Sequence, residues 1–118
     1  MIELLYDADT NGLDVHDQDA ESVFIETYGP LPDVAKIKVF DHKRERNELF
    51  SGTVAIGKTF EVTGDALGRR WIPPKLIVEI TDPDSGMMVQ SIEFHTSCSQ
   101  PLHVGDQFGG IGVYDFHR

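Results

Sequence analysis

The chain has 118 residues, the size of one domain built around one hydrophobic core, and we treat residues 1–118 as a single domain. It carries 20 acidic residues against 10 Lys and Arg, a formal net charge of −10. A surface of this charge repels phosphate backbones and anionic lipid, so we expect no nucleic-acid partner and a preference for divalent cations. We also expect no membrane insertion, because no stretch approaches the roughly 18 apolar residues of a membrane span.

Short segments rich in Val, Ile, Phe and Thr alternate apolar and polar residues along the whole chain, which is typical of half-buried strands. In chain order we expect strands at Ile2–Tyr6, Val23–Glu26, Lys36–Val39, Leu49–Ile56, Thr59–Thr63, Lys75–Thr81, Met87–His95 and Phe108–Tyr114. No window of helical length shows a convincing 3.6-residue repeat. About eight strands in so short a chain predict an all-β fold, a two-sheet antiparallel β-sandwich with jelly-roll-like or Greek-key connections.

The first long loop is acidic and predicts a calcium site. Its opening, Asp7-Ala8-Asp9-Thr10-Asn11-Gly12, has the D-x-D-x-N-G pattern of the first half of a calcium loop. Calcium takes 6–8 oxygen ligands, and alternate residues of a tightly curled loop direct their oxygens to one centre. The expected ligands are the side chains of Asp7, Asp9 and Asn11 and the backbone carbonyl of Leu13.

The second half of this loop departs from the EF-hand pattern, because Gln18 stands where a bidentate Glu belongs and no amphipathic helix flanks the loop. The missing carboxylate is expected from the same loop or from a later turn. The candidates are Asp14, Asp17, Asp19, Asp82 and Asp84. The alternative is a solvated acidic loop without an ion.

The single cysteine excludes an intrachain disulfide. Cys98 lies between His95 and His103, and three N and S ligands of this kind suit zinc or copper. A cysteine nucleophile with a histidine base is a second interpretation. The favoured interpretation is structural, with a buried cysteine in a tight bend.

Arg70 and Trp71 form a candidate binding surface, since an arginine beside an exposed tryptophan suits stacking on sugars or peptides. The alternative is that Trp71 plugs one end of the sandwich. The only basic run, His42–Asn47, is expected to be a solvated hairpin loop rather than a docking patch.

The segments Val89–Leu102 and Val104–Gly109 resemble the signature of a largely uncharacterised β domain found in large bacterial extracellular or cell-surface proteins. The resemblance implies an extracellular structural or adhesive module with no established catalysis. Members of that family commonly carry a further cysteine in the first loop, which would suit a disulfide to the signature cysteine. This chain has Asp7–Thr10 there instead, so Cys98 lacks that partner.

We therefore expect a non-catalytic module of a bacterial surface or secreted protein, stabilised by calcium at Asp7–Asp19. Its expected partners are other protein modules or like subunits, with carbohydrate as a further candidate. One alternative is a self-assembling filament or surface-layer subunit whose strand edges are completed by a neighbour. Another is a small metal-dependent enzyme or carbohydrate-binding domain. The opening residues lack the basic and apolar parts of a secretory signal, so the extracellular expectation depends on the resemblance.

Overall fold

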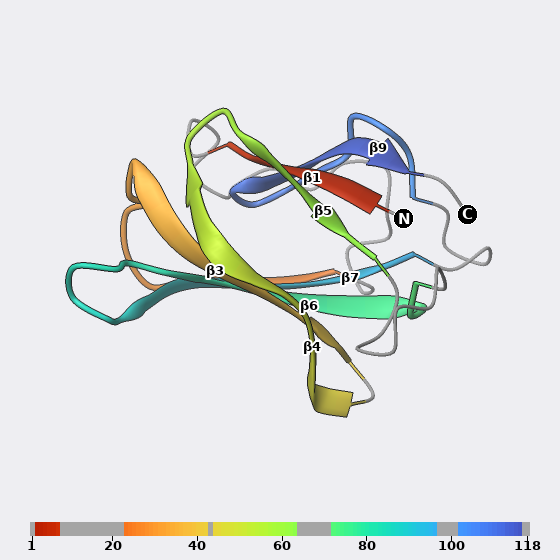
Figure 1. Ribbon diagram of the computed structural model, residues 1–118, viewed down its shortest axis with the longest axis horizontal. Coiled ribbons are helices and arrows are strands. Elements are labelled where there is room, and N and C mark those ends of the chain that lie inside the picture. The colour runs from red at the N-terminus through yellow and green to blue at the C-terminus, as the bar shows by residue number, and fades with distance from the viewer. Residues whose placement is uncertain (1, 8–22, 43, 64–71, 97–101, 117–118) are drawn as a thin grey trace.

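A computed structural model describes residues 2–7, 23–42, 44–63, 72–96 and 102–116. The predicted all-β fold is confirmed: two antiparallel sheets lie face to face as a sandwich (Figure 1). Within the described segments there are nine strands, β1 (Ile2–Tyr6), β2 (Phe24–Thr27), β3 (Val34–Asp41), β4 (Arg44–Ala55), β5 (Thr59–Val62), β6 (Lys75–Thr81), β7 (Met88–His95), β8 (Gln107–Phe108) and β9 (Ile111–Phe116). These segments contain no helix long and apolar enough to cross a bilayer.

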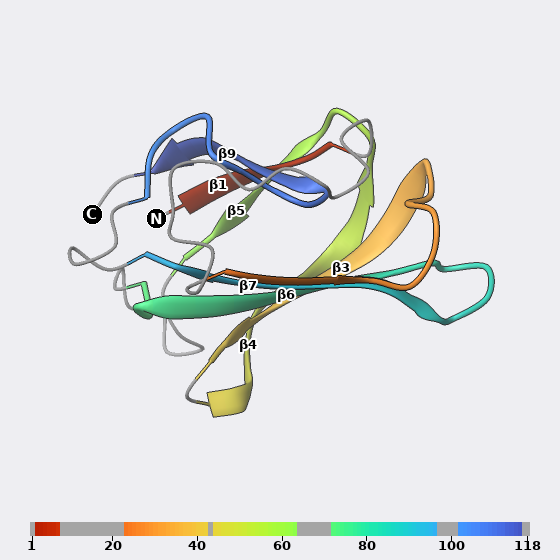
Figure 2. The same ribbon diagram turned by 180° about the vertical axis from the view of Figure 1, so that it is seen from behind.

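The strand order shows which strands form each of the two sheets. One sheet has the order β5-β1-β9-β8, and the other has the order β2-β7-β6-β3-β4. The long strand β4 begins in the lower layer of Figure 1 and rises to the level of the upper layer, where a turn leads into β5. Figure 2 shows the same two layers from behind. The first and last strands, β1 and β9, are antiparallel neighbours.

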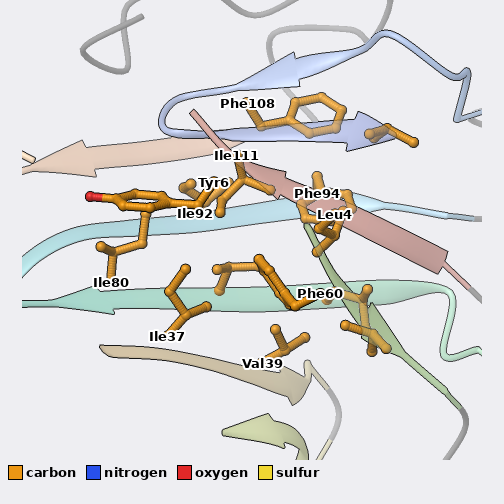
Figure 3. Close-up of a cluster of buried hydrophobic side chains, with 14 of the residues drawn as sticks. Leu4, Tyr6, Ile37, Val39, Phe60, Ile80, Ile92, Phe94, Phe108 and Ile111 are labelled. Atoms are coloured by element: carbon orange, nitrogen blue, oxygen red, sulfur yellow. The ribbon is translucent and has the colours of Figure 1, made fainter. Parts of the chain in front are cut away.

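Strict alternation of side chains explains why these segments form strands with one buried face. In β6, Leu76, Val78 and Ile80 are buried and alternate with partly exposed residues. The inward side chains of both sheets form one hydrophobic cluster, part of which is drawn in Figure 3. This cluster fixes which face of every strand is turned outward.

Two pairs of stacked aromatic rings connect the layers. Phe94 on β7 stacks on Phe108 on β8, with ring centroids 4.7 Å apart and planes inclined by 13°. Phe50 on β4 stacks on Phe60 on β5, also at 4.7 Å. Such pairs contribute about 0.5–1.5 kcal/mol each beyond the area they bury, so they help to hold the two sheets in a fixed relation.

Two segments differ from expectation. The basic run His42–Asn47 was predicted to be a hairpin loop, but β4 already begins at Arg44, which pairs with Asp41 across the hairpin. The segment Phe108–Tyr114 was predicted as one strand, but Gly109 and Gly110 form a turn that divides it into β8 and β9. Gly109 has φ +60°, a conformation that ends a strand and that glycine adopts without strain.

Candidate functional site

The end of β1 lies where the predicted calcium loop begins. The Asp7 N–H donates a 2.8 Å hydrogen bond to the carbonyl of Gly110 in the turn between β8 and β9. The buried Tyr6 hydroxyl donates a 2.6 Å bond to the carbonyl of Pro32, in the segment that leads into β3. The first residue of the acidic loop is therefore anchored to both sheets through its own backbone and through its neighbour.

Two carboxylates act on Tyr6 at this end of the sandwich. Burial, with smaller contributions from the carboxylates of Asp33 and Asp82, raises the pKa of Tyr6 to about 12. Both carboxylates act on the Tyr6 phenol although they are far from it in sequence. The sequence patterns did not single out Asp33, whose position emerges only from the fold.

Asp82 and Asp84 belong to the tight turn between β6 and β7. The Asp84 N–H donates to Asp82 Oδ1 at 2.9 Å, and the Gly86 N–H donates to the Asp82 carbonyl at 2.8 Å. One carboxylate oxygen of Asp82 is therefore already used by the turn. Its second oxygen and both oxygens of the exposed Asp84 are of the hard oxygen type that calcium prefers.

The described part of the chain holds only a portion of the predicted metal ligands. Asp7, Asp82 and Asp84 are described, and among the described residues no three His, Cys, Asp or Glu side chains are arranged to hold a metal ion. The remaining candidates lie outside the described residues, namely Asp9, Asn11, Leu13, Asp14, Asp17 and Asp19. A calcium shell at this end would thus need ligands from the segment 8–22.

The structure describes two of the three residues predicted to bind zinc or copper. The N–H of the exposed His103 donates to Oδ2 of the buried Asp106 at 2.9 Å, which closes the bend before β8. His95 is the last residue of β7 and pairs with Lys75 on β6. Cys98 lies outside the described residues, as do Arg70 and Trp71.

His95 belongs to an ionisable group on the outer face of the five-stranded sheet, which we call the basic corner: His42, Lys75, Glu93 and His95. Lys75 Nζ lies 3.4 Å from Glu93 Oε2, and His42 Nε2 lies 3.9 Å from the same oxygen. Lys75 also lies over the exposed ring of Phe24, 5.6 Å from its centroid. One carboxylate is thus shared between an ammonium group and an imidazole.

The surroundings of His95 disfavour its charged form. Burial lowers its pKa, and the nearby Lys75 and His42 lower it further, while Glu93 acts in the opposite direction. The imidazole therefore gains its proton only at a lower pH than a solvated histidine does. The members of the basic corner come from β6, β7 and the turn after β3, so only the fold brings them together.

Gln90 is a second feature that sequence reasoning missed. Its buried side chain donates through Nε2 to Thr27 Oγ1 at 2.9 Å and accepts the Gly110 N–H through Oε1 at 2.8 Å. A Cβ atom on Gly109 would lie 2.5 Å from that Oε1. The available signal was a polar amide in an apolar strand together with the Gly109-Gly110 pair, two glycines that permit close approach.

A family model described as a domain of unknown function matches residues 1–116 of the chain. No curated protein and no solved structure matches it. The match spans nearly the whole sandwich, so the family corresponds to the fold described above rather than to one loop of it.

Proposed function

The chain belongs to the family described as Domain of unknown function (DUF7467), and we propose that it acts as a non-catalytic structural or adhesive module of a bacterial surface or secreted protein. The observation that carries this proposal is the hydrogen bonding of the Gln90 side chain. Its buried amide hydrogen bonds to both sheets. The Tyr6 hydroxyl likewise donates a hydrogen bond to the Pro32 carbonyl. Buried polar groups committed in this way rigidify a core.

The extracellular location is supported by the resemblance of Val89–Gly109 to domains of large surface proteins. A rigid sandwich with outward polar faces suits a module that separates or presents neighbouring domains. The proposed partners are therefore other protein modules or like subunits, with carbohydrate as a further candidate.

We further propose that calcium stabilises the module at Asp7–Asp19. The D-x-D-x-N-G pattern supports this, as does the position of Asp7 at the end of the sandwich where Asp33 and Asp82 act on Tyr6. Carboxylates crowded within a Debye length repel one another, and a divalent cation offsets that repulsion. Oxygen ligands from Asp7, Asp9, Asn11 and Leu13 would hold the ion, with Asp82 or Asp84 as an additional ligand.

Thermal unfolding with millimolar calcium and with a chelator tests the calcium proposal. A ligand at 100 times its dissociation constant stabilises the native state by about 2.7 kcal/mol, so we expect the melting temperature to rise by several degrees with calcium. Asp9→Asn should abolish this shift, whereas the matched control Asp115→Asn on β9 should retain it. An unchanged melting temperature would contradict the calcium proposal, while the proposal of a structural module would still stand.

A surface-binding assay with the purified protein at two concentrations tests the proposal that the module is adhesive. Retention on an acidic or neutral polysaccharide film, lost on unfolding, would support adhesion. A module that binds no film but increases the melting temperature of an adjoining domain in the parent chain would support a purely structural role.

A further inference from the structure

Strand β2 has the weakest attachment to the core of the sandwich. It has four residues, Phe24–Thr27, lies at one edge of the five-stranded sheet, and pairs only with β7 among the described strands. None of its side chains is buried, whereas each of the other eight described strands contributes at least one buried side chain to the hydrophobic cluster. Burial of apolar surface is the main gain in free energy that holds a strand in place. We therefore expect β2 to leave the sheet more readily than any other described strand.

The surface that β2 covers is complementary to the residues of β2 itself. Ile25 is the register partner of the buried Ile92, and its half-buried side chain packs against the hydrophobic cluster. The buried Gln90 donates through Nε2 to Thr27 Oγ1 at 2.9 Å. These contacts depend on the sequence of β2 and not on the molecule to which it belongs. A second copy of the chain supplies the identical strand, so its β2 fits this surface in the same register.

The connections on both sides of β2 favour its transfer to a neighbouring molecule. Residues 7–23, which precede β2, form the longest connection between consecutive described strands. Gly29-Pro30-Leu31-Pro32, which we call the hinge, follows β2, and the chain bends at Gly29 and again at Asp33 before β3 begins. Proline fixes φ and pushes the residue before it toward an extended conformation. The two prolines thus favour an extended hinge, and straightening at Gly29 would direct β2 away from its own β7.

We propose that β2 is exchanged between copies of the chain: β2 of one molecule occupies the edge of β7 in a second molecule, which returns its own β2 to the first. The pair is closed by a two-fold axis, and the contacts of β2 with β7 are the same as in the monomer. The inference rests on the proposed function in one respect, since it specifies how like subunits join. Its failure would leave both the structural module and its calcium standing.

Concentration decides between the closed monomer and the exchanged pair, because both contain the same contacts. A strand held by short flexible connections meets its own partner strand at an effective concentration of the order of millimolar. Exchange should therefore become measurable as the protein concentration approaches about 1 mM. The net charge of −10 opposes the approach of two copies, so salt should increase the exchanged fraction by screening that repulsion.

Cysteines placed across the β2–β7 ladder test the proposal. Glu26 and Ser91 are register partners, and the Cα atoms of such a pair lie about 4.5–5.5 Å apart, within the range of a disulfide. Glu26→Cys and Ser91→Cys are made in separate chains whose single cysteine is replaced by Cys98→Ser. The two chains are mixed at about 1 mM in about 0.3 M salt, diluted to about 10 µM and oxidised at once. We expect a disulfide-linked heterodimer, because exchange places residue 26 of one chain beside residue 91 of the other.

A mixture of Glu26→Cys with Ser51→Cys is the matched control. Ser51 is exposed on β4, at the opposite edge of the same sheet, and its register partner is Lys38 on β3. We expect at least about fivefold more heterodimer from the Ser91 mixture than from this control. Equal yields would mean that random collisions form the disulfide, and they would overturn the proposal.

A chain that carries both Glu26→Cys and Ser91→Cys gives an independent readout. Oxidation at about 10 µM ties β2 to its own β7, so this chain should then remain monomeric after incubation at about 1 mM and size-exclusion chromatography. Reduction should restore the dimer fraction of the unmodified chain. A dimer that forms in spite of the disulfide overturns the proposal. An unmodified chain that stays monomeric at about 1 mM also overturns it, and that measurement stands even if a cysteine variant fails to fold.

Discussion

The side-chain oxygen of Gln90 on β7 accepts a 2.8 Å hydrogen bond from the N–H of Gly110, which lies in the opposite sheet. The amide nitrogen of the same side chain donates to Thr27 on β2, so one residue connects an edge strand, a central strand and the β8–β9 turn. The fold thus uses a buried amide as a connection between its layers, and the first two predictions examine that connection.

Gln90→Leu should lower the free energy of unfolding by about 1–3 kcal/mol, because it leaves the buried Gly110 N–H without its acceptor, whereas the hydroxyl of the exposed Thr27 can turn to water. Urea unfolding followed by tryptophan fluorescence measures the change. Ser91→Ala, one residue along on the outer face, should change it by less than about 0.5 kcal/mol. Equal effects of the two variants would mean that the amide is not a connection between the sheets.

Gly109→Ala should be more damaging than Gly57→Ala. Both glycines have positive φ, which costs an alanine about 1–2 kcal/mol, but only at Gly109 would the new methyl meet Gln90 Oε1, at 2.5 Å, whereas nothing lies within 4 Å at Gly57. We expect about 2–4 kcal/mol of destabilisation at Gly109, since overpacking adds to the backbone cost. In a Gln90→Ala background the two penalties should become similar, and a Gly109 penalty that persists there would refute the steric explanation.

Tyr6 should ionise only in strong alkali. Because burial and the carboxylates of Asp33 and Asp82 raise its folded pKa to about 12, the unfolded chain releases this proton first. Stability is therefore full below about pH 10, the ordinary tyrosine value, and falls as the pH rises toward 12. Ultraviolet titration of the three tyrosines should show one phenol near pH 12 that disappears in Tyr6→Phe and remains in Tyr114→Phe. The pKa of Tyr28 is also raised, by its hydrogen bond to Glu26, so assignment depends on the variants.

His95 should make the fold sensitive to acid. Its folded pKa lies below the ordinary value of 6.5, so its contribution to stability is complete above pH 6.5 and is lost as the pH falls toward the lowered folded pKa. Denaturation of dilute protein across this range should show a decline that is smaller in His95→Gln. Proton NMR of Lys75→Met should show the His95 titration shifted to higher pH, because a cation has been removed. A titration unmoved in Lys75→Met would mean that the lysine charge does not reach the imidazole.

The sequence alone was sufficient to predict the bounds of a strand in which apolar and polar residues alternate strictly. Lys75–Thr81 agrees with β6 at both ends because Leu76, Val78 and Ile80 must all face the core. It was insufficient at Arg44–Asn47, where a polar run gives no period and the strand continues because β3 offers it hydrogen-bonding partners. It was also insufficient at Gly109-Gly110, since two glycines permit a close approach within a strand as well as a turn.

The candidate site shows the same limit. The acidic loop is visible from the spacing of its aspartates, but the closeness of Asp33 and Asp82 to Tyr6 depends on strand order. The basic corner arises from cross-strand pairing of residues as distant in sequence as His42 and His95, and no local pattern records that pairing. Strict alternation inside one segment was predictable, and contacts between segments were not.

The pairing of Ile2 with Phe116 determines how the domain responds to a pulling force between these two residues. Because β1 and β9 run antiparallel as neighbours, a pull applied between these two residues acts at one end of their ladder and across its hydrogen bonds. The bonds then open one after another, as in a zipper, rather than resisting together as they would in shear. A tether attached at these two points would therefore open this pair of strands from the Ile2–Phe116 end.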